Sequence, residues 1–158
     1  MESDHDAGLP DSGYQRDPLT VFAGQITSFD AKIYSLNKYS NLVGLSCAAG
    51  STNPPQICTP LTPVLPSTAG TPLAVNVSGA VGDYLFNLHA VGSDPLAITH
   101  DFPLTLHIVD FSLAAPLPAS VSVAPGATSP PISLGLSALR SFSGSVTLAC
   151  AGLPQGAT

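Results

Sequence analysis

The sequence contains few charged residues, no tryptophan and a single methionine, Met1. Charged residues make up 9% of the 158 residues, whereas globular proteins average about 25%. The four basic residues are scattered, so we expect no surface for nucleic acid or anionic lipid. The acidic residues are scattered too, apart from a cluster near the start that we interpret as a solvated tail.

Long apolar runs and helical patterns are also missing. No stretch approaches 18 consecutive apolar residues, so we expect no membrane insertion. The first residues lack a basic stretch followed by an apolar one, so they do not form a signal peptide; an exported form would be an internal piece or a mature chain. Sixteen prolines are spread through the sequence, and proline disrupts helix interiors. The apolar fraction of 44% nevertheless suffices for a packed core, which favours an all-β protein.

An internal repeat is the most informative feature of the sequence. Residues 19–24 resemble residues 120–126, and each segment is a short alternating strand closed by a glycine turn. Residues 39–48 resemble residues 142–151, with an aromatic residue, a valine, a leucine and a cysteine in register. We therefore expect the two cysteine-bearing segments to form equivalent strands.

The length of the repeat indicates its architecture. Cys150 follows Cys47 by 103 residues, and a period of about 100 residues corresponds to one β-sandwich domain rather than to a solenoid unit. We therefore divide the chain into an N-terminal tail with a candidate first strand, one complete sandwich, and the first half of a second; these cover residues 1–17, 18–110 and 111–158.

Strand-like runs alternate with turn signals between the repeats, as expected of an all-β domain. In the run from Gln25 to Tyr34, for example, Phe29 and Ile33 share one face while Asp30 lies on the other. The predicted strands of the first unit cover residues 19–24, 25–34, 42–48, 71–78, 83–91 and 104–108, the last leading directly into residues 111–113.

The second unit supplies only about half of the residues that a sandwich needs. Three or four strands alone would leave one sheet face and several edges uncovered. One explanation is that the sequence is cut short; the alternative is that another molecule completes the unit by strand addition. Residues 114–118, rich in proline and alanine, are predicted to form a stiff, extended joint that limits swinging between the units.

Residues 121–126 and 142–158 together resemble a bacterial immunoglobulin-like repeat found in large secreted or surface proteins, notably of acidobacteria. The stretch to compare with the family signature GFSGSVTLSCSGLPAGATC reads FSGSVTLACAGLPQGAT. The match is close in the second unit and looser in the first, where residues 50–57 replace the Gly-Leu-Pro segment. The resemblance implies an immunoglobulin-like β-sandwich, a secreted or cell-surface location, and a role in spacing or adhesion. It implies no single activity, because sandwich folds host many functions.

The three cysteines fit this picture. Cys47 and Cys58 bracket a ten-residue loop, a suitable span for a disulfide that ties a strand to the following turn. Such a bridge would stabilise the fold by about 3 kcal/mol. By the repeat, Cys150 is unpaired in this fragment and would pair with a cysteine just beyond Thr158. The alternative is three free, buried thiols; metal-ligand spacings such as Cys-x-x-Cys are absent.

Other candidate site residues have structural explanations. Tyr84 stands where sandwich domains place a tyrosine corner, and its hydroxyl would bond to backbone near the preceding turn. Asn76 begins an Asn-Val-Ser glycosylation pattern that is common by chance. The histidines are interpreted as solvated or strand-surface residues rather than as a catalytic or metal site, and the exposed tyrosines as scattered rather than as a carbohydrate-stacking patch; these are His5, His89, His100 and His107, and Tyr14, Tyr34 and Tyr39.

These observations predict a non-enzymatic, extracellular immunoglobulin-like module without cofactor, catalytic residue or metal. Its role would be that of a spacer or adhesion element, and its partners would be neighbouring repeats, in the same or adjacent chains, or surface protein or polysaccharide. One alternative is a filament subunit completed by a neighbour's strand. Another is an accessory carbohydrate-binding module of a secreted enzyme.

Overall fold

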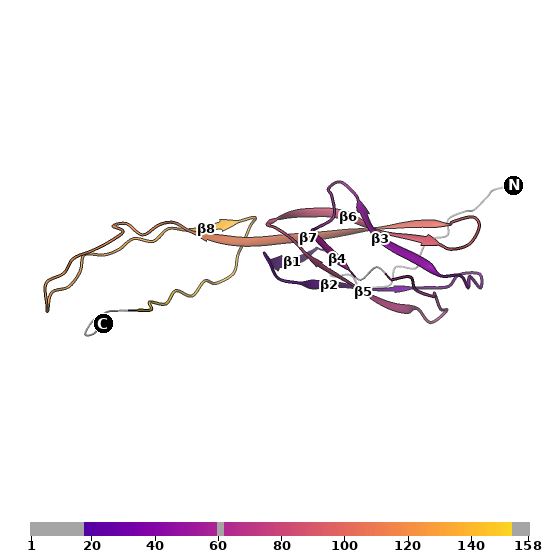
Figure 1. Ribbon diagram of the computed structural model, residues 1–158, viewed down its shortest axis with the longest axis horizontal. Helices are drawn as coiled ribbons and strands as arrows, with labels where there is room; N and C mark the ends of the chain where they lie inside the picture. Colours follow the sequence, from indigo (N-terminus) through magenta and orange to yellow (C-terminus); the bar gives the residue numbers. More distant parts are fainter. Residues whose placement is uncertain (1–17, 60–61, 153–158) are drawn as a thin grey trace.

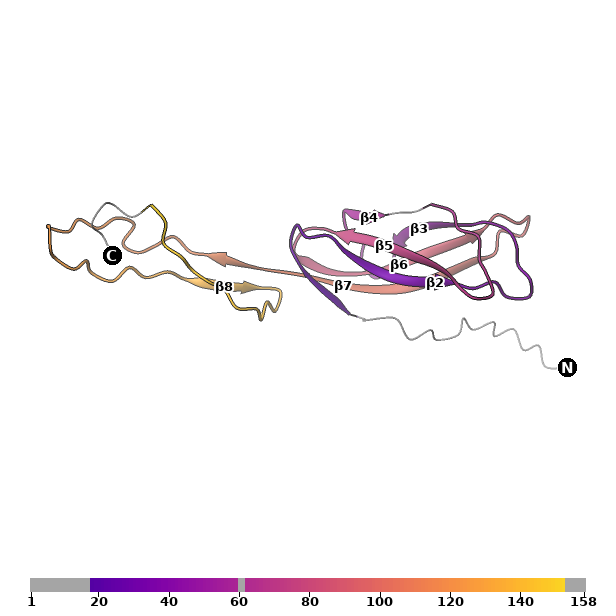
Figure 2. The same ribbon diagram turned by 90° about the horizontal axis from the view of Figure 1, so that it is seen from below.

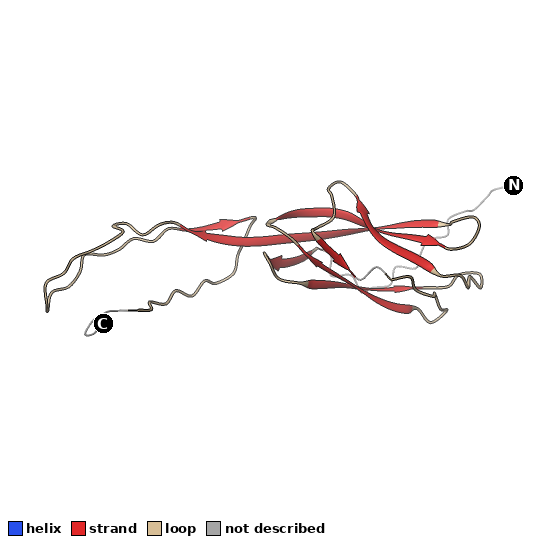
Figure 3. Ribbon diagram, in the orientation of Figure 1, coloured by secondary structure: helices blue, strands red, loops and turns tan. Residues whose placement is uncertain are grey.

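The computed structural model describes residues 18–59 and 62–152, and within these residues it contains eight strands and no helix (Figure 3). The predicted tail, with His5 and Tyr14, lies outside the described residues. In chain order the strands are β1 (Leu19–Phe22), β2 (Thr27–Ile33), β3 (Val43–Ala49), β4 (Ile57–Thr59), β5 (Thr71–Ser78), β6 (Gly82–Gly92), β7 (Thr99–Leu113) and β8 (Leu136–Leu139).

The first seven strands form two sheets packed face to face (Figures 1 and 2). One sheet has the order β1-β7-β6-β3, and the other has the order β2-β5-β4. Neighbouring strands are antiparallel except β1 and β7, which run parallel. The all-β prediction and the packing of two layers are therefore confirmed for the described residues.

The core lies between these two sheets and follows from period-two alternation. In β6 the even-numbered side chains point inward, so that Phe86 is 1% exposed while its neighbour Leu85 is 42% exposed. Phe86 meets Phe29 of the opposite sheet in an edge-to-face contact, with ring centroids 6.2 Å apart. Burial of apolar surface is the dominant favourable term in folding. The buried core residues are Phe29, Val43, Leu45, Val75, Val77, Phe86, Leu88, Leu104, Leu106 and Ile108.

The predicted strands of the first unit agree with the structure except in two places. Strand β7 begins at Thr99 and not at Leu104, because residues 99–103 are all exposed and show no alternating burial, and β4 was not predicted. The alternating segments form β1, β2, β3, β5 and β6, and the boundaries of β5 are those predicted. Sequence reasoning placed no strand at β4, which spans three residues next to a turn-rich loop. A segment that short offers too few residues to display an alternating pattern.

Strand β7 is 15 residues long and changes its inward face along its length. From Leu104 to Ile108 the even-numbered side chains enter the core of the first unit, whereas His100 and Phe102 before them are exposed. Val109 is also buried, and the apolar residues that follow are odd-numbered. Asp110 and Ser112 occupy the alternate positions. The predicted domain boundary after residue 110 therefore falls inside a continuous strand. Before the boundary this strand pairs with β6, and at its end it pairs with β8.

As far as residue 152, the second unit contains the end of β7 and one further strand, β8, which pairs antiparallel with residues 110–113 of β7. The prediction that Cys150 lies on a strand equivalent to that of Cys47 is wrong for this structure, because residues 142–152 form no strand. Strand β3 exists because β6 pairs with it along seven residues. The described residues of the second unit include no counterpart of β6, and a lone extended segment has no ladder of hydrogen bonds.

The repeat is nevertheless visible in the glycine turns. The amide of Gln25 donates to the carbonyl of Phe22 at 3.1 Å. In the equivalent turn of the second unit the amide of Ala127 donates to the carbonyl of Ala124 at 3.0 Å. Gly24 and Gly126, at the same position of the two turns, both have a φ of 78°. A positive φ at this position is the property that requires glycine in a type II turn.

A second pair of equivalent turns follows β2 and β8. In residues 36–39 and in residues 139–142, the amide of the fourth residue donates to the carbonyl of the first, at 2.9 and 3.4 Å. Both central residues of each turn have positive φ, 50° and 63° in the first and 53° and 59° in the second. Two consecutive non-glycine residues in this conformation are uncommon. The two units therefore share turn geometry, even though the cysteine-bearing segments differ.

Candidate functional site

The junction where β7 leaves the first sandwich is the most developed site that joins distant parts of the chain. Three phenylalanines meet there: Phe22 at the end of β1, Phe111 on β7 and Phe142 just after β8. The ring of Phe142 lies 5.6 Å from that of Phe22 and 5.4 Å from that of Phe111, centroid to centroid. Tilted aromatic pairs at this separation stabilise by about 0.5–1.5 kcal/mol beyond the area they bury. The turn after β8 is thus held against the first unit.

A charged group lies on the same junction. One carboxylate oxygen of Asp83 is 2.8 Å from Nδ1 of His107, and the other accepts a hydrogen bond from the Arg140 guanidinium at 3.3 Å. These side chains come from β6, β7 and the turn after β8 respectively. They are 35–58% exposed, and exposed ion pairs typically contribute 1 kcal/mol at most. The aromatic contacts and this exposed charged group both link the turn after β8 to the first unit.

The junction joins the two units through a shared strand and packed side chains. A strand passes through it without a break, and side chains from three other segments pack beside that strand. In Figure 1 the second unit accordingly extends along the long axis of the first. We refer to this contact, made by Phe22, Asp83, His107, Phe111, Arg140 and Phe142, as the joint.

Cys47 and Cys58 form a disulfide, with their Cα atoms 6.4 Å apart. Cys47 lies on β3 and Cys58 on β4, so that the bridge connects the two sheets rather than a strand and a turn. Both sulfur-bearing side chains pack against the hydrophobic core. Cys150, by contrast, is exposed and carries a free thiol. The bridge therefore fixes the two layers of the first unit.

Tyr84 lies at the start of β6, after the turn from β5. Its hydroxyl donates to the carbonyl of Ala80, four residues upstream, at 2.9 Å, and its ring packs against the core. This is the backbone contact that the sequence predicted for a tyrosine corner. Such a bond fixes the turn between the two sheets.

His89 and His107 lie on the outer face of the β6–β7 pair, as predicted. His100 pairs with Ala90, on the face opposite to His89, and is exposed near the start of β7. His89 is hydrogen-bonded through Nδ1 to Asp101 at 2.6 Å, and the register also places Ser46 beside His89 on β3. The row Ser46, His89 and Asp101 combines the residue types of a catalytic triad. However, no described residue accepts a hydrogen bond from the Ser46 hydroxyl, so the contact that activates a serine is missing in this geometry.

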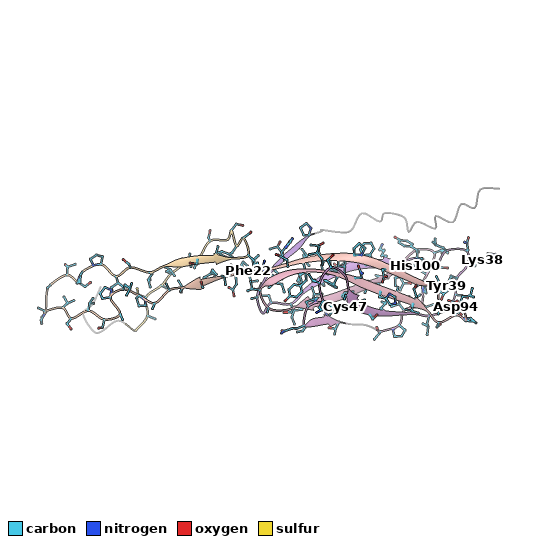
Figure 4. All side chains as sticks on the ribbon, turned by 90° about the horizontal axis from the view of Figure 1, so that it is seen from above. Phe22, Lys38, Tyr39, Cys47, Asp94 and His100 are labelled. Carbon is cyan, nitrogen blue, oxygen red and sulfur yellow. A yellow bond between two sulfur atoms is a disulfide. The ribbon has the colours of Figure 1, made fainter. Side chains whose placement is uncertain are left out.

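A second polar contact, at the end of the first unit opposite the joint, was not predicted from the sequence. The hydroxyl of Tyr39 donates to Asp94 at 2.7 Å, which links the β2–β3 turn to the β6–β7 turn (Figure 4). This hydrogen bond, followed by burial and by the negative charge of Asp94, raises the pKa of Tyr39. The same hydrogen bond, supported by the backbone amide of Leu96, lowers the pKa of Asp94. Because 55 residues separate the partners, no local pattern signals the contact.

The remaining candidates do not converge on one site. Tyr34 forms an isolated parallel β-bridge with Ser67 just beyond the end of β2, whereas the hydroxyl of Tyr39 donates to Asp94. Asn76 is exposed on β5. Within residues 18–59 and 62–152, no three or more His, Cys, Asp or Glu side chains are grouped to hold a metal ion. The same residues contain no helix able to cross a membrane.

Comparison with known proteins gives no family assignment. No protein-family model matches the chain, and no curated protein or solved structure is significantly similar to it.

Proposed function

We propose that this chain is a non-catalytic, immunoglobulin-like module that spaces or presents parts of an extracytoplasmic protein. The strand order supports the immunoglobulin-like topology. Sheets ordered β1-β7-β6-β3 and β2-β5-β4 correspond to an A′GFC sheet facing a BED sheet, with the parallel pairing of the first and last strands at one edge. The hydrogen bond from Tyr84 stands at the E–F corner of that topology.

The observation that carries the proposal is the continuity of β7 through the joint. The same strand closes the first sandwich and pairs with β8 in the second unit. A flexible linker between the units would allow them to reorient. A paired strand against which Phe142 packs, through its contacts with Phe22 and Phe111, would not. A spacer requires this property, because its length must not depend on thermal bending.

The disulfide supports the proposed location. Disulfides persist in oxidising compartments and are rare in the cytosol of most organisms. The Cys47–Cys58 bridge joins β3 and β4, the edge strands of their sheets, and so ties the two layers together at one edge of the sandwich. A spacer or adhesion element outside the cytoplasm would benefit from such a bridge.

The proposal is tested by the distance distribution between spin labels on the two units. Labels are placed on the full chain at Ala74→Cys and Thr128→Cys, with Cys150→Ser to remove the free thiol. Both labelling positions are exposed. Pulsed electron–electron double resonance should give one narrow distribution of distances between the two labels. The Phe142→Ala variant should broaden it, because the ring that touches Phe22 and Phe111 is removed.

The matched control is Leu148→Ala, which removes an exposed apolar side chain of the second unit away from the joint's aromatic contacts. It should leave the distribution as narrow as that of the parent. A broad distribution in the parent itself would show that the units move freely and would reject the spacer proposal.

A further inference from the structure

The turn that carries Phe142 at the joint has a counterpart at the far end of the first unit. Residues 139–142 follow β8, and residues 36–39 follow β2, at an offset of 103 in the sequence. Each turn contains two consecutive residues with positive φ and begins with a leucine that is 38–43% exposed. Tyr39 occupies the position of Phe142, so both turns end on an aromatic ring.

In the described part of the chain, another unit covers only one of these two turns. The turn after β8 meets the end of the first sandwich that we call its base, where Phe142 lies 5.6 Å from Phe22 between ring centroids. Arg140 of the same turn bonds to Asp83 of the base. The turn after β2 lies at the opposite end of the first unit, as the positions of Phe22 and Tyr39 in Figure 4 show.

The side chains around residues 36–39 suit a contact of the same kind. Lys38 is exposed, and it supplies a cation next to the position that is equivalent to Arg140. Leu96, on the β6–β7 turn that is hydrogen-bonded to Tyr39, is 83% exposed. This end of the unit therefore presents aromatic, cationic and apolar groups, which complement a base that carries a phenylalanine and an aspartate.

We propose that residues 36–39 dock against the base of another unit of the same kind, which precedes the first unit as the first precedes the second. The joint itself identifies this occupant, because it shows what the equivalent turn packs against. The inference rests on the proposed spacer function and adds a second joint to it. Such a contact is small, but units that follow one another in a chain are held at a high effective concentration, so a few side chains can fix their arrangement.

A tandem protein tests the proposal. The first unit closes its own core between its two sheets, so a second copy of it can be added upstream of the chain. Residues 1–113 of one copy are joined directly to residues 12–158 of another, which places Leu19 after Leu113 at the spacing that Val121 has in the chain itself. Spin labels at Ala74→Cys in both copies, with Cys150→Ser, report the distance between the two complete sandwiches. Pulsed electron–electron double resonance should give one narrow distribution.

The variants of the tandem protein all concern Tyr39. Tyr39→Ala in the downstream copy should abolish the narrow distribution, because it removes the ring that corresponds to Phe142. The same substitution in the upstream copy is the matched control, since that turn faces no other unit, and it should leave the distribution narrow. Tyr39→Phe in the downstream copy keeps the ring and loses only the hydroxyl bonded to Asp94, so it should also leave the distribution narrow.

Two outcomes would overturn the inference. A broad distribution in the unsubstituted tandem protein means that residues 36–39 do not dock, and equal effects of Tyr39→Ala in the two copies mean that the ring acts only within its own unit. The spacer proposal is tested separately by the labels at positions 74 and 128 of the chain itself. A narrow distribution there, with a broad one in the tandem protein, rejects the second joint and leaves the spacer proposal standing.

Discussion

The two units begin with similar sequence patterns but reach different degrees of structure. In the first, the strand bearing Cys47 pairs with β6, and the opposite sheet covers its inner side chains. In the second, the segment bearing Cys150 forms no strand, and Leu148 beside it is 57% exposed. An alternating sequence specifies which faces a strand would have, but the strand itself forms only where a neighbour supplies hydrogen bonds and a facing layer supplies burial.

The joint shows where the two units depend on each other. Strand β7 is stable as far as Ile108 because it lies between β1 and β6. Beyond that residue it is the template on which β8 pairs. The first unit therefore imposes order on the part of the second that touches it, and the part that lies farther away is extended without regular pairing (Figure 3).

The largest expected difference between the units concerns core packing. Phe86→Ala should lower the free energy of unfolding by about 3–5 kcal/mol, because it opens a cavity beside Phe29 in the closed core. Leu148→Ala in the second unit should change it by less than about 0.5 kcal/mol. Chemical denaturation followed by circular dichroism measures both. Equal effects would mean that the second unit has a core comparable to the first.

The second-largest expected difference between the units is the effect of their cysteines on the free energy of unfolding. Replacing Cys47 and Cys58 by serine should cost about 3 kcal/mol, because the bridge restricts the unfolded chain. Cys150→Ser should leave the free energy of unfolding unchanged, since its thiol is exposed and free. Thermal unfolding with and without a reducing agent checks this. A reductant-insensitive parent would contradict the stabilising role of the bridge.

A smaller effect is expected at the tyrosine corner. Tyr84→Phe removes the hydroxyl that donates to Ala80 and should cost about 1 kcal/mol. Tyr34→Phe is the control, because no described residue hydrogen-bonds to the Tyr34 hydroxyl, and it should stay within about 0.5 kcal/mol of the parent. If the two variants unfold at the same denaturant concentration, the corner bond adds nothing measurable.

The smallest effect is a pH dependence at the end of the first unit opposite the joint. The hydrogen bond from Tyr39 lowers the pKa of Asp94 in the folded protein. The stability that this bond contributes is therefore present above the ordinary carboxyl pKa, and it is lost as the pH falls through the lowered pKa of the folded state. Tyr39→Phe should raise the pKa of Asp94 toward that of a free carboxyl. Carbon-detected NMR titration of the Asp94 side chain in both proteins measures this, and identical titration curves would contradict the assigned cause.

Much of the first unit was predictable from the sequence because its strands are long and half-buried. The alternation in residues 71–78 and 83–91 identified β5 and β6, and the spacing of Cys47 and Cys58 identified the bridge. Strand β4 is too short to show a period. The joint could be predicted only in part. The sequence indicated that β7 runs into residues 111–113, but it gave no local sign of the side-chain contacts that make up the joint.

What remained hidden depends on residues far apart in the chain. Asp83 and Arg140 are separated by 57 positions, and Tyr39 and Asp94 by 55. Such pairs are created by the register of strands and by the turns that carry them. The strand predicted around Cys150 failed for a related reason, because its pattern was suitable but its pairing partner was not among the described residues.

Amide hydrogen exchange along β7 tests the central claim most directly, because the claim is that one continuous strand belongs to both units. The account predicts slowed exchange from Leu104 through the segment 110–113, with faster exchange in residues 120–131, which form no strand. Protection that ends at Val109, with residues 110–113 exchanging as fast as residues 120–131, would contradict a shared strand and with it the rigid joint.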